Sequence, residues 1–231
     1  MNIIKNEKMI KRNGKIGQWS SLVGLVILAG GMYISFQRPE LFSYSLAALL
    51  IGFTLTQISM YYGNRYGRSP RPDEKLDAGL KGLPGEFYLY HYITPVPHLL
   101  VGPAGVWILM PYHQRGQVVF KNNRWRLSGG GFLQGYLRIF GQEGLGRPEL
   151  EAEHQIGLIK KHIKKKVDQL EIPEISSLMV FTNNEVELNP EGSSLPSIKL
   201  KQLKDFMRQK SKDKKINPTL TKRLIDLFGR T

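Results

Sequence analysis

The chain contains no cysteine among its 231 residues. Disulfide bonds, thiolate zinc sites and cysteine nucleophiles are therefore excluded. Acidic residues are also scarce, since 19 Asp and Glu stand against 33 Lys and Arg, for a formal net charge of +14. A chain this basic is attracted to polyanions, either the phosphate backbone of a nucleic acid or the anionic headgroups of a lipid. The charge alone does not choose between them.

One long segment, from Phe87 to Gln142, has neither Asp nor Glu. Mg²⁺ prefers oxygen ligands, and a magnesium-dependent hydrolase needs carboxylates to hold the ion. A magnesium site therefore cannot be built from this segment alone. The Gly-x-Ser-x-Gly motif of the serine hydrolases is also missing from the chain.

Two runs near the N-terminus lack charged residues and are long enough to cross a bilayer. They cover residues 18–37 and 41–64, and each supplies the ~20 helical residues that a hydrocarbon core of ~30 Å requires. The separator Arg38-Pro39-Glu40 allows only a tight turn, so we expect an antiparallel transmembrane hairpin over residues 18–64. The alternative is a pair of buried core helices. Small residues would let the two helices pack closely; they are Gly24, Gly30, Gly31, Ala47, Ala48 and Gly52.

The flanks of the two runs are basic and predict the orientation of the hairpin. Five cations precede the first run and three follow the second: Lys5, Lys8, Lys11, Arg12, Lys15, Arg65, Arg68 and Arg71. By the positive-inside rule, both flanks are expected on the cytoplasmic side. We therefore expect an integral protein of a prokaryotic plasma membrane with both ends inside. Residues 1–17 would form a basic cytoplasmic tail, and residues 65–72 a linker close to anionic headgroups.

The rest of the chain alternates between strand and helix patterns. Runs rich in aromatic and β-branched residues predict strands, and apolar residues spaced by three or four predict helices. The expected strands cover 87–93, 99–101, 106–110, 117–120, 125–127, 177–181 and 185–188, and the expected helices cover 73–83, 148–170, 201–210 and 218–228. This order predicts an α/β domain over residues 73–210, with a mixed central sheet flanked by helices. Residues 211–231 are expected to form a basic helical tail.

The segment from Ser128 to Gly146 is rich in glycine and is expected to be a lid or an unstructured connection. It lacks the Lys-Ser or Lys-Thr ending of a phosphate loop. The helix that follows carries lysines toward its C-terminal end, where they suit the helix dipole. These lysines and the arginines after the hairpin are also candidate contacts to phosphate or lipid. The candidates are Arg65, Arg68, Arg71, Lys160, Lys161, Lys164 and Lys165.

The stretch from Leu80 to Val118, and above all HLLVGPAGVWIL, resembles the centre of a NERD (nuclease-related) domain. In that family a helix precedes a hairpin with a Gly-Pro-x-Gly-Val turn. The later helix from Arg147-Pro148, the strand LMVFTN and the helix around Leu203 follow in the order that the family shows. The resemblance covers about Asp73 to Lys210. It implies a restriction-endonuclease-like fold and, for active members, metal-dependent cleavage of nucleic acid.

The family motif places an Asp before the first strand of this hairpin and a Glu-x-Lys at the end of the second. The matching positions here are Pro97, Met110 and Tyr112, so all three expected catalytic side chains are missing. Asp73 or Glu74 matches an acidic residue that the family often carries on its first helix. The resemblance therefore implies a degenerate, non-catalytic member that holds no metal cofactor.

Histidines offer a different metal chemistry. His91, His98 and His113 lie on or beside the predicted strands, and three imidazoles can bind zinc. Their spacing is irregular, and structural or surface histidines are the commoner case. Whether the three converge depends on the fold.

Three function hypotheses follow. The first is a binding or scaffold module at the cytoplasmic membrane face, with the bilayer and its anionic headgroups as the nearest partner. The second is a nuclease whose carboxylates have migrated and bind Mg²⁺; its candidates are Glu143, Glu149 and Glu151. The third is nucleic-acid binding without cleavage, with an affinity that falls steeply as salt rises.

Overall fold

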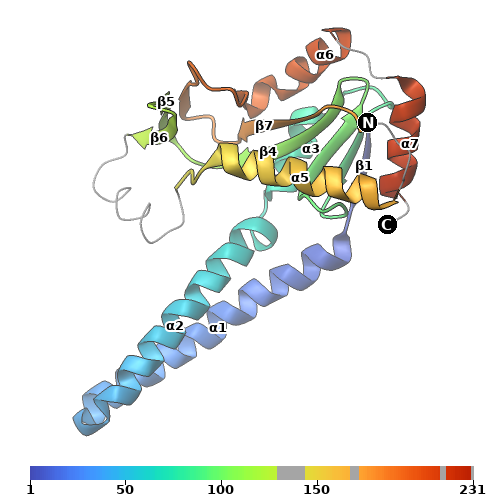
Figure 1. Ribbon diagram of the computed structural model, residues 1–231. Helices are drawn as coiled ribbons and strands as arrows, with labels where there is room; N and C mark the ends of the chain where they lie inside the picture. The colour runs from blue at the N-terminus through green and yellow to red at the C-terminus, as the bar shows by residue number, and fades with distance from the viewer. Residues whose placement is uncertain (129–143, 167–171, 214–216, 230–231) are drawn as a thin grey trace. The chain divides into compact units, whose positions relative to one another are not determined.

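The computed structural model describes residues 1–128, 144–166, 172–213 and 217–229 (Figure 1). The chain forms two compact units. One consists of Glu7–Arg71, and the other combines Met1–Asn6 with Pro72–Thr231. The first residues of the chain therefore belong to the unit that follows the long helices.

The larger unit contains a six-stranded sheet with the strand order β1-β2-β3-β4-β7-β9. Its strands are β1 (Asn2–Lys5), β2 (Tyr88–His91), β3 (His98–Gly102), β4 (Gly105–Tyr112), β7 (Ile175–Phe181) and β9 (Ser197–Lys199). The pairs β2/β3 and β3/β4 are antiparallel, whereas β1/β2, β4/β7 and β7/β9 are parallel. The predicted α/β unit with a mixed central sheet is confirmed.

Helices cover both faces of this sheet. The helices described in this unit are α3 (Pro72–Leu80), α5 (Pro148–Lys166), α6 (Leu203–Asp213) and α7 (Pro218–Gly229), and a short 3₁₀ turn, η3 (Leu200–Gln202), precedes α6. Leu100 of β3 packs in one apolar cluster with α3 and α6, and its neighbour Leu99 packs in the other with α5 and α7. Figure 1 shows α5 crossing one face of the sheet. Strands buried on both faces need near-continuous apolar sequence, and β3 and β4 have it.

A smaller sheet has the strand order β6-β5-β8. Its strands are β5 (Gly116–Lys121), β6 (Arg124–Ser128) and β8 (Val186–Asn189). The predicted ribbon of β5 and β6 is confirmed. Asn122 and Asn123 at its turn have φ angles of 54° and 57°, which is the left-handed conformation that a two-residue hairpin turn requires.

The predicted N-terminal tail over residues 1–17 is wrong, because this segment contains β1 and the first part of α1. β1 pairs in parallel with β2, with Asn2 opposite Tyr88 and Lys5 opposite His91. The N-terminal ammonium also donates to the Leu83 carbonyl at 3.1 Å. Four residues that extend an existing sheet need little apolar sequence of their own, and the basic charge of this segment predicted a tail instead of a strand.

Two further boundaries differ from the prediction. The expected linker over residues 65–72 begins inside a helical turn, η2 (Gly63–Gly67), and ends where α3 starts. The expected tail over residues 211–231 contains α7, which belongs to the core because Leu224 and Phe228 are fully buried. The folded unit therefore extends past residue 210. Helix α7 contains basic residues, but its other face is apolar and buried.

The smaller unit is an antiparallel pair of long helices, α1 (Glu7–Gln37) and α2 (Phe42–Tyr62), joined by the 3₁₀ turn η1 (Pro39–Leu41). Both helices are long and apolar enough to cross a membrane, and only 11% of the most apolar window of each is buried. Core helices of a soluble protein are mostly buried. The two helices therefore do not fit the alternative of a buried helix pair.

Close packing of α1 on α2 depends on glycines that recur every seven residues on α1. A Cβ added to Gly31 would lie 2.7 Å from the Ala48 Cβ, and one added to Gly24 would lie 3.2 Å from the Leu55 Cβ. Serine hydroxyls of α2 donate to the carbonyls of Gly31 and Gly17 at 3.0 and 2.9 Å. The predicted contacts of Gly24, Gly31, Ala48 and Gly52 are confirmed, whereas Gly30 and Ala47 lie on exposed faces.

Candidate functional site: a buried ionic network between α3 and the sheet

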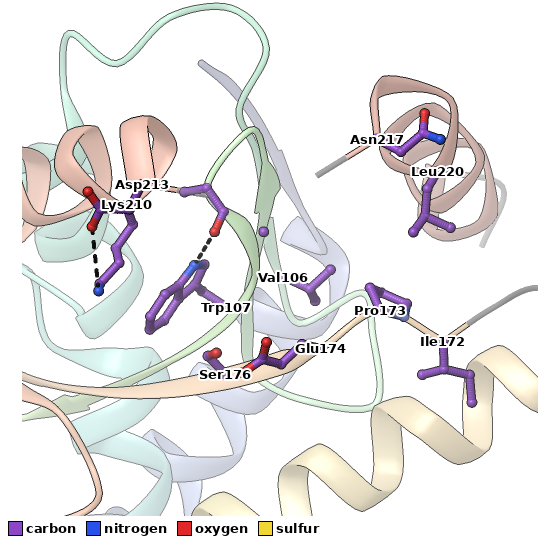
Figure 2. Close-up of a pocket in the computed structure, with 12 residues that line it drawn as sticks. Val106, Trp107, Ile172, Pro173, Glu174, Ser176, Lys210, Asp213, Asn217 and Leu220 are labelled. Carbon is purple, nitrogen blue, oxygen red and sulfur yellow. Dashed lines mark hydrogen bonds and ion pairs between the residues drawn. The ribbon is translucent and has the colours of Figure 1, made fainter. Parts of the chain in front are cut away.

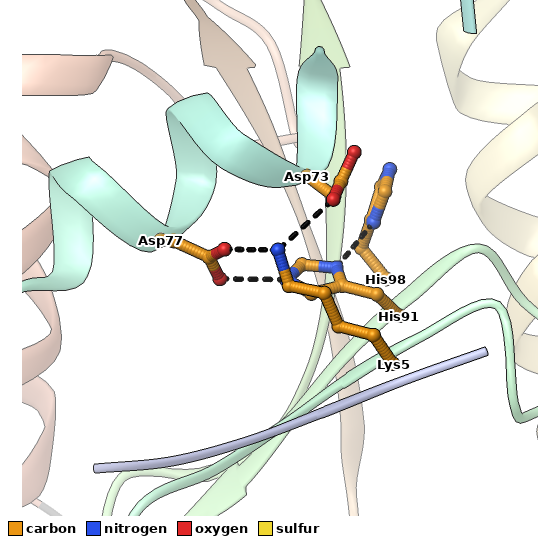
Figure 3. A network of polar contacts seen from close by, with 5 residues as sticks. All are labelled: Lys5, Asp73, Asp77, His91 and His98. Carbon is orange, nitrogen blue, oxygen red and sulfur yellow. Dashed lines mark hydrogen bonds and ion pairs between the residues drawn. The ribbon is translucent and has the colours of Figure 1, made fainter. Parts of the chain in front are cut away.

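Two buried histidines face each other where β2 ends and β3 begins. His91 and His98 are directly opposite in the antiparallel register, and their exposed fractions are 0% and 3%. Their Nδ1 atoms are 2.7 Å apart, and Figure 3 shows the two rings joined by this contact. The connection between the strands is closed by the Tyr92 N–H, which donates to the Pro97 carbonyl at 2.8 Å.

Helix α3 supplies two carboxylates to the same place. Asp73 and Asp77 are four residues apart and so share one face of the helix. The Asp77 Oδ1 lies 3.0 Å from the His91 Nε2. A carboxylate only accepts, so His91 donates through Nε2–H, and in the neutral pair its Nδ1 accepts the proton that His98 donates from Nδ1. The tautomer of each ring is thus set by its neighbour.

Lys5, the last residue of β1, completes the network. Its Nζ lies 3.0 Å from the Asp73 Oδ2 and also contacts the Asp77 Oδ2. Burial alone would lower the pKa of Lys5, but the hydrogen bonds and charges of Asp77 and Asp73 raise it above 10.5. Burial would likewise raise the pKa of Asp77, and the bonds to His91 and Lys5 lower it below 3.8. Both groups are therefore held in their charged forms.

The network brings a lysine and two carboxylates together, as a magnesium nuclease site would, but the lysine already bonds to both carboxylates. The Lys5 ammonium bonds to both carboxylates, and the Asp73 side chain has an exposed fraction of 0%. A hydrolytic metal site keeps a coordination position open for water or substrate. The contacts of the network hold β1, α3 and the start of the β2–β3 connection together.

The three histidines proposed as zinc ligands do not all meet. His91 and His98 come together, and His113 is exposed beyond the end of β4. Among the residues that the structure describes, no group of three His, Asp or Glu side chains is arranged to hold a metal ion. The two buried histidines instead use their ring nitrogens within the network.

Met110 and Tyr112, the positions that the resemblance matches to a catalytic Glu-x-Lys, lie on β4, on the face that packs against α5. Both side chains are buried in the apolar core, with exposed fractions of 3% and 8%. The Tyr112 ring stacks on Phe181 at 5.5 Å, and its hydroxyl donates to the Glu151 Oε2 at 3.2 Å. Burial first, and the Glu151 charge second, raise the pKa of Tyr112. The phenol therefore stays protonated and remains a donor. Pro97, the third position, is partly buried before β3.

One of the carboxylates proposed to migrate does reach the end of β4. Glu151, in the first turns of α5, accepts from Tyr112 and also from the Gln155 Nε2 at 3.0 Å. Both donors are neutral groups. Glu149 lies on the same turn of α5, and Glu143 falls outside the described residues. Of the predicted acidic remnants, Asp73 belongs to the ionic network and Glu74 is partly exposed beside it.

A cavity of about 620 Å³ opens at the opposite end of the sheet, between the β3–β4 turn, the start of β7 and the facing ends of α6 and α7. Figure 2 shows Trp107 at its wall, with the Lys210–Asp213 ion pair beside it. Trp107 donates its Nε1–H to the Ala104 carbonyl at 2.8 Å. None of Pro97, Met110 and Tyr112 lines this cavity, so it is separate from the positions that the resemblance matches to a catalytic site.

The candidate phosphate and lipid contacts fall on both units. Lys160, Lys161, Lys164 and Lys165 are exposed along α5, away from the buried Ile159 and Ile163. Arg65 and Arg68 are exposed after α2, and Arg71 is partly buried. Arg65 also lies over the Tyr61 ring at 4.5 Å and donates to its hydroxyl at 2.9 Å.

Lys5 and Asp77, the two residues that join the network together, were not among the site residues predicted from the sequence. Asp73 and Asp77 at i and i+4 give a detectable signal, since both fall on one face of a short helix. Lys5 gives no such signal, because its position depends on the pairing of β1 with β2. In comparisons with known proteins, no family model, no curated protein and no solved structure matches this chain.

Proposed function

We propose that this chain is a membrane-anchored, non-catalytic, NERD-like protein that serves as a binding or scaffold module at the cytoplasmic face of the membrane. The main support for the proposal is that the side chains of Met110 and Tyr112 are buried in the apolar core. A nuclease of this class would present a carboxylate and a lysine there, and these positions instead hold side chains buried in the core. In the ionic network, the Lys5 ammonium bonds to both carboxylates, those of Asp73 and Asp77.

The order of the elements supports the restriction-endonuclease-like fold in this proposal. Helix α3 is followed by β2, β3, β4, α5 and β7, which is the order that the resemblance implies. The Gly102–Gly105 turn joins β3 to β4 in antiparallel register, as expected for the Gly-Pro-x-Gly-Val hairpin.

Chain connectivity supports the proposed anchor with both ends on one side. β1 precedes the long helices and α3 follows them, yet both belong to one folded unit. A hydrogen-bonded sheet cannot have strands on opposite sides of a bilayer. If the helices span the membrane, the unit that contains β1 and α3 therefore lies entirely on one side, and the basic flanks favour the cytoplasmic side.

A metal-dependent nuclease assay tests the absence of catalysis. The purified full chain in detergent is incubated with single-stranded and double-stranded nucleic acid in the presence of Mg²⁺ or Mn²⁺. We expect the same background cleavage from the wild type, Glu151→Gln and Asp77→Asn. Metal-dependent cleavage that either substitution abolishes would refute the proposal.

The contact between Tyr112 and Glu151 favours one second candidate, a nuclease with a migrated carboxylate. In that case Glu151 and Glu149 would bind Mg²⁺ at the end of β4, in place of the missing Glu-x-Lys. Glu151→Gln keeps an acceptor for the Tyr112 hydroxyl and removes the charge. It would therefore abolish cleavage while leaving the unfolding temperature nearly unchanged.

The exposed lysines of α5 favour the remaining candidate, nucleic-acid binding without cleavage. Four phosphate contacts would make the logarithm of the affinity fall with the logarithm of the salt concentration with a slope of about −4. Retention of DNA by the wild type at low salt, lost in the Lys160→Gln/Lys161→Gln/Lys164→Gln/Lys165→Gln variant, would support it. No retention at low salt removes this candidate.

A further inference from the structure

Helix α1 is longer than a membrane span requires, and its extra length is the charged first part. The helix has 31 residues, about 46 Å at 1.5 Å per residue, whereas a hydrocarbon core is about 30 Å thick. The charged part, from Glu7 to Lys15, extends about 13 Å beyond the uncharged run. A headgroup layer adds about 5–8 Å on each side of the core. On the proposed membrane anchor, on which this inference rests, the segment crosses that layer.

This part of α1 has two different faces. Ile10, Asn13, Gly14 and Gly17 are buried, and a Cβ added to Gly14 would lie 3.2 Å from the Tyr66 carbonyl oxygen. The opposite face carries only exposed cations, which we call the basic stem face: Lys8, Lys11, Arg12 and Lys15. At 3.6 residues per turn the four cations fall within an arc of about 100°. Tight packing of the buried face on η2 keeps the basic stem face turned outward.

The same face continues into aromatic and then aliphatic side chains. Trp19, Leu22 and Val26 follow the cations along it, with exposed fractions of 63%, 53% and 64%. Tryptophan prefers the interface between headgroups and acyl chains. If Trp19 lies at that level, the other residues lie farther from the membrane centre along the helix axis: Lys15 by about 6 Å, Arg12 by about 10 Å and Lys8 by about 16 Å. Arg12 and Lys15 are then at the level of the lipid phosphates.

We propose that the basic stem face binds the phosphate groups of anionic phospholipids, with Arg12 and Lys15 making the closest contacts. The sequence has no acidic residue between Glu7 and Glu40, so this face has a strong positive potential along the chain. Arginine binds phosphate in a bidentate manner, and each cation near an anionic surface strengthens binding by about fivefold. The module would therefore select the lipids around its anchor.

The test uses the full chain reconstituted in phosphatidylcholine bilayers with a trace of spin-labelled lipid. Electron paramagnetic resonance measures the fraction of labelled lipid that the protein immobilises, for an anionic phosphatidylglycerol label and for a phosphatidylcholine label. We expect severalfold preference for the anionic label, which decreases as salt rises. In the Lys8→Gln/Lys11→Gln/Arg12→Gln/Lys15→Gln variant, the two labels should be immobilised equally.

Two matched variants make the result specific. The Lys160→Gln/Lys161→Gln/Lys164→Gln/Lys165→Gln variant loses the same charge from α5 and should keep the anionic preference. Arg12→Gln/Lys15→Gln should lose more of it than Lys8→Gln/Lys11→Gln, because the first pair lies closer to the phosphates. Equal immobilisation of the two labels by the wild type, or equal loss from the α5 variant, overturns the inference. Extraction of the wild type from the bilayer by alkaline carbonate would instead refute the proposed membrane anchor, on which the inference rests.

Discussion

The Lys5 Nζ lies 3.0 Å from the Asp73 Oδ2, although the two residues are 68 positions apart in the chain. The whole of the long helical hairpin lies between them in sequence. One ion pair thus joins the strand that precedes the hairpin to the helix that follows it. Because the Asp73 side chain is completely buried, the Lys5 ammonium compensates a charge that water cannot reach.

Lys5→Met tests the strength of this link. The substitution keeps much of the side-chain volume and removes the charge, so Asp73 is left buried beside an apolar group. Removing one partner of a buried ion pair costs about 3 kcal/mol or more. We expect a loss of that order in the free energy of unfolding, measured by urea denaturation of the full chain in detergent.

A double-mutant cycle separates the pair from side-chain packing. Adding Asp73→Asn to Lys5→Met should recover part of the lost free energy, since the uncompensated charge is removed. Lys8→Met, on the exposed face of α1, is the control and should change the free energy of unfolding by less than about 0.5 kcal/mol. Simple additivity of Lys5→Met and Asp73→Asn would contradict the account.

The network also predicts how stability depends on pH. The pKa of Asp77 is lowered on folding, so its contribution is complete above the ordinary value of 3.8 and is lost as the pH falls below it. The pKa of Lys5 is raised on folding, so its contribution is complete below 10.5 and is lost as the pH rises above it. We therefore expect stability to decrease at both extremes.

Thermal unfolding across this pH range provides the measurement. Asp77→Asn should lessen the decrease in unfolding temperature on the acid side, and Lys5→Met should lessen it on the alkaline side. A wild-type profile whose alkaline part is the same as that of Lys5→Met would show that the ion pair adds nothing to stability.

Tyr112→Phe tests the contact between the end of β4 and α5. The substitution keeps the ring that stacks on Phe181 and removes the hydroxyl that donates to Glu151. A single hydrogen bond of this kind contributes about 1 kcal/mol, so we expect a loss of that size in the free energy of unfolding. Tyr44→Phe, at a residue with an exposed fraction of 68%, should have no effect. A gain in stability from Tyr112→Phe would contradict the described contact.

Adjacent glycines of α1 give a matched test of the hairpin. Gly31→Leu places its Cβ 2.7 Å from the Ala48 Cβ, whereas a Cβ at Gly30 meets nothing within 4 Å. Overpacking of a tight contact costs about 1–3 kcal/mol. Gly31→Leu should therefore lower the thermal stability of the hairpin in detergent, followed by helical circular dichroism, and Gly30→Leu should not. Equal effects would mean that the Gly31 face is not the packed one.

Much of this fold follows from local patterns in the sequence. The long uncharged runs, the apolar strands β3 and β4 and the amphipathic helix α5 were predicted because each carries an apolar run or stripe long enough to be recognised on its own. β1 was not predicted. Four residues with only Ile3 and Ile4 as apolar members carry no periodic signal, and their structure comes from pairing with β2, which is 83 or more residues away.

The candidate site was harder to predict for the same reason. His91, His98 and Asp73 were identified as candidates, but their roles depend on Lys5 and on the face of α3 that carries Asp77. The predicted strands suggested zinc ligation by the histidines, and the resemblance suggested a remnant acid at Asp73. In the structure His91 bonds to His98 and Asp77, and Asp73 bonds to Lys5. The resemblance predicted that catalytic side chains are missing at Pro97, Met110 and Tyr112, whereas the contact between Glu151 and the Tyr112 hydroxyl depends on the packing of α5 on β4.

The central claim is that the hairpin crosses the membrane between two segments of one folded unit. Because the chain has no cysteine, single cysteines can report it: Glu7→Cys before the hairpin, Glu40→Cys at its turn and Ser194→Cys in the larger unit, all at exposed positions. The account predicts that a membrane-impermeant maleimide labels only Glu40→Cys in intact cells, and labels the other two once the membranes are opened. Labelling of Glu7→Cys and Ser194→Cys from opposite sides, or of Glu40→Cys from the same side as both, would contradict it.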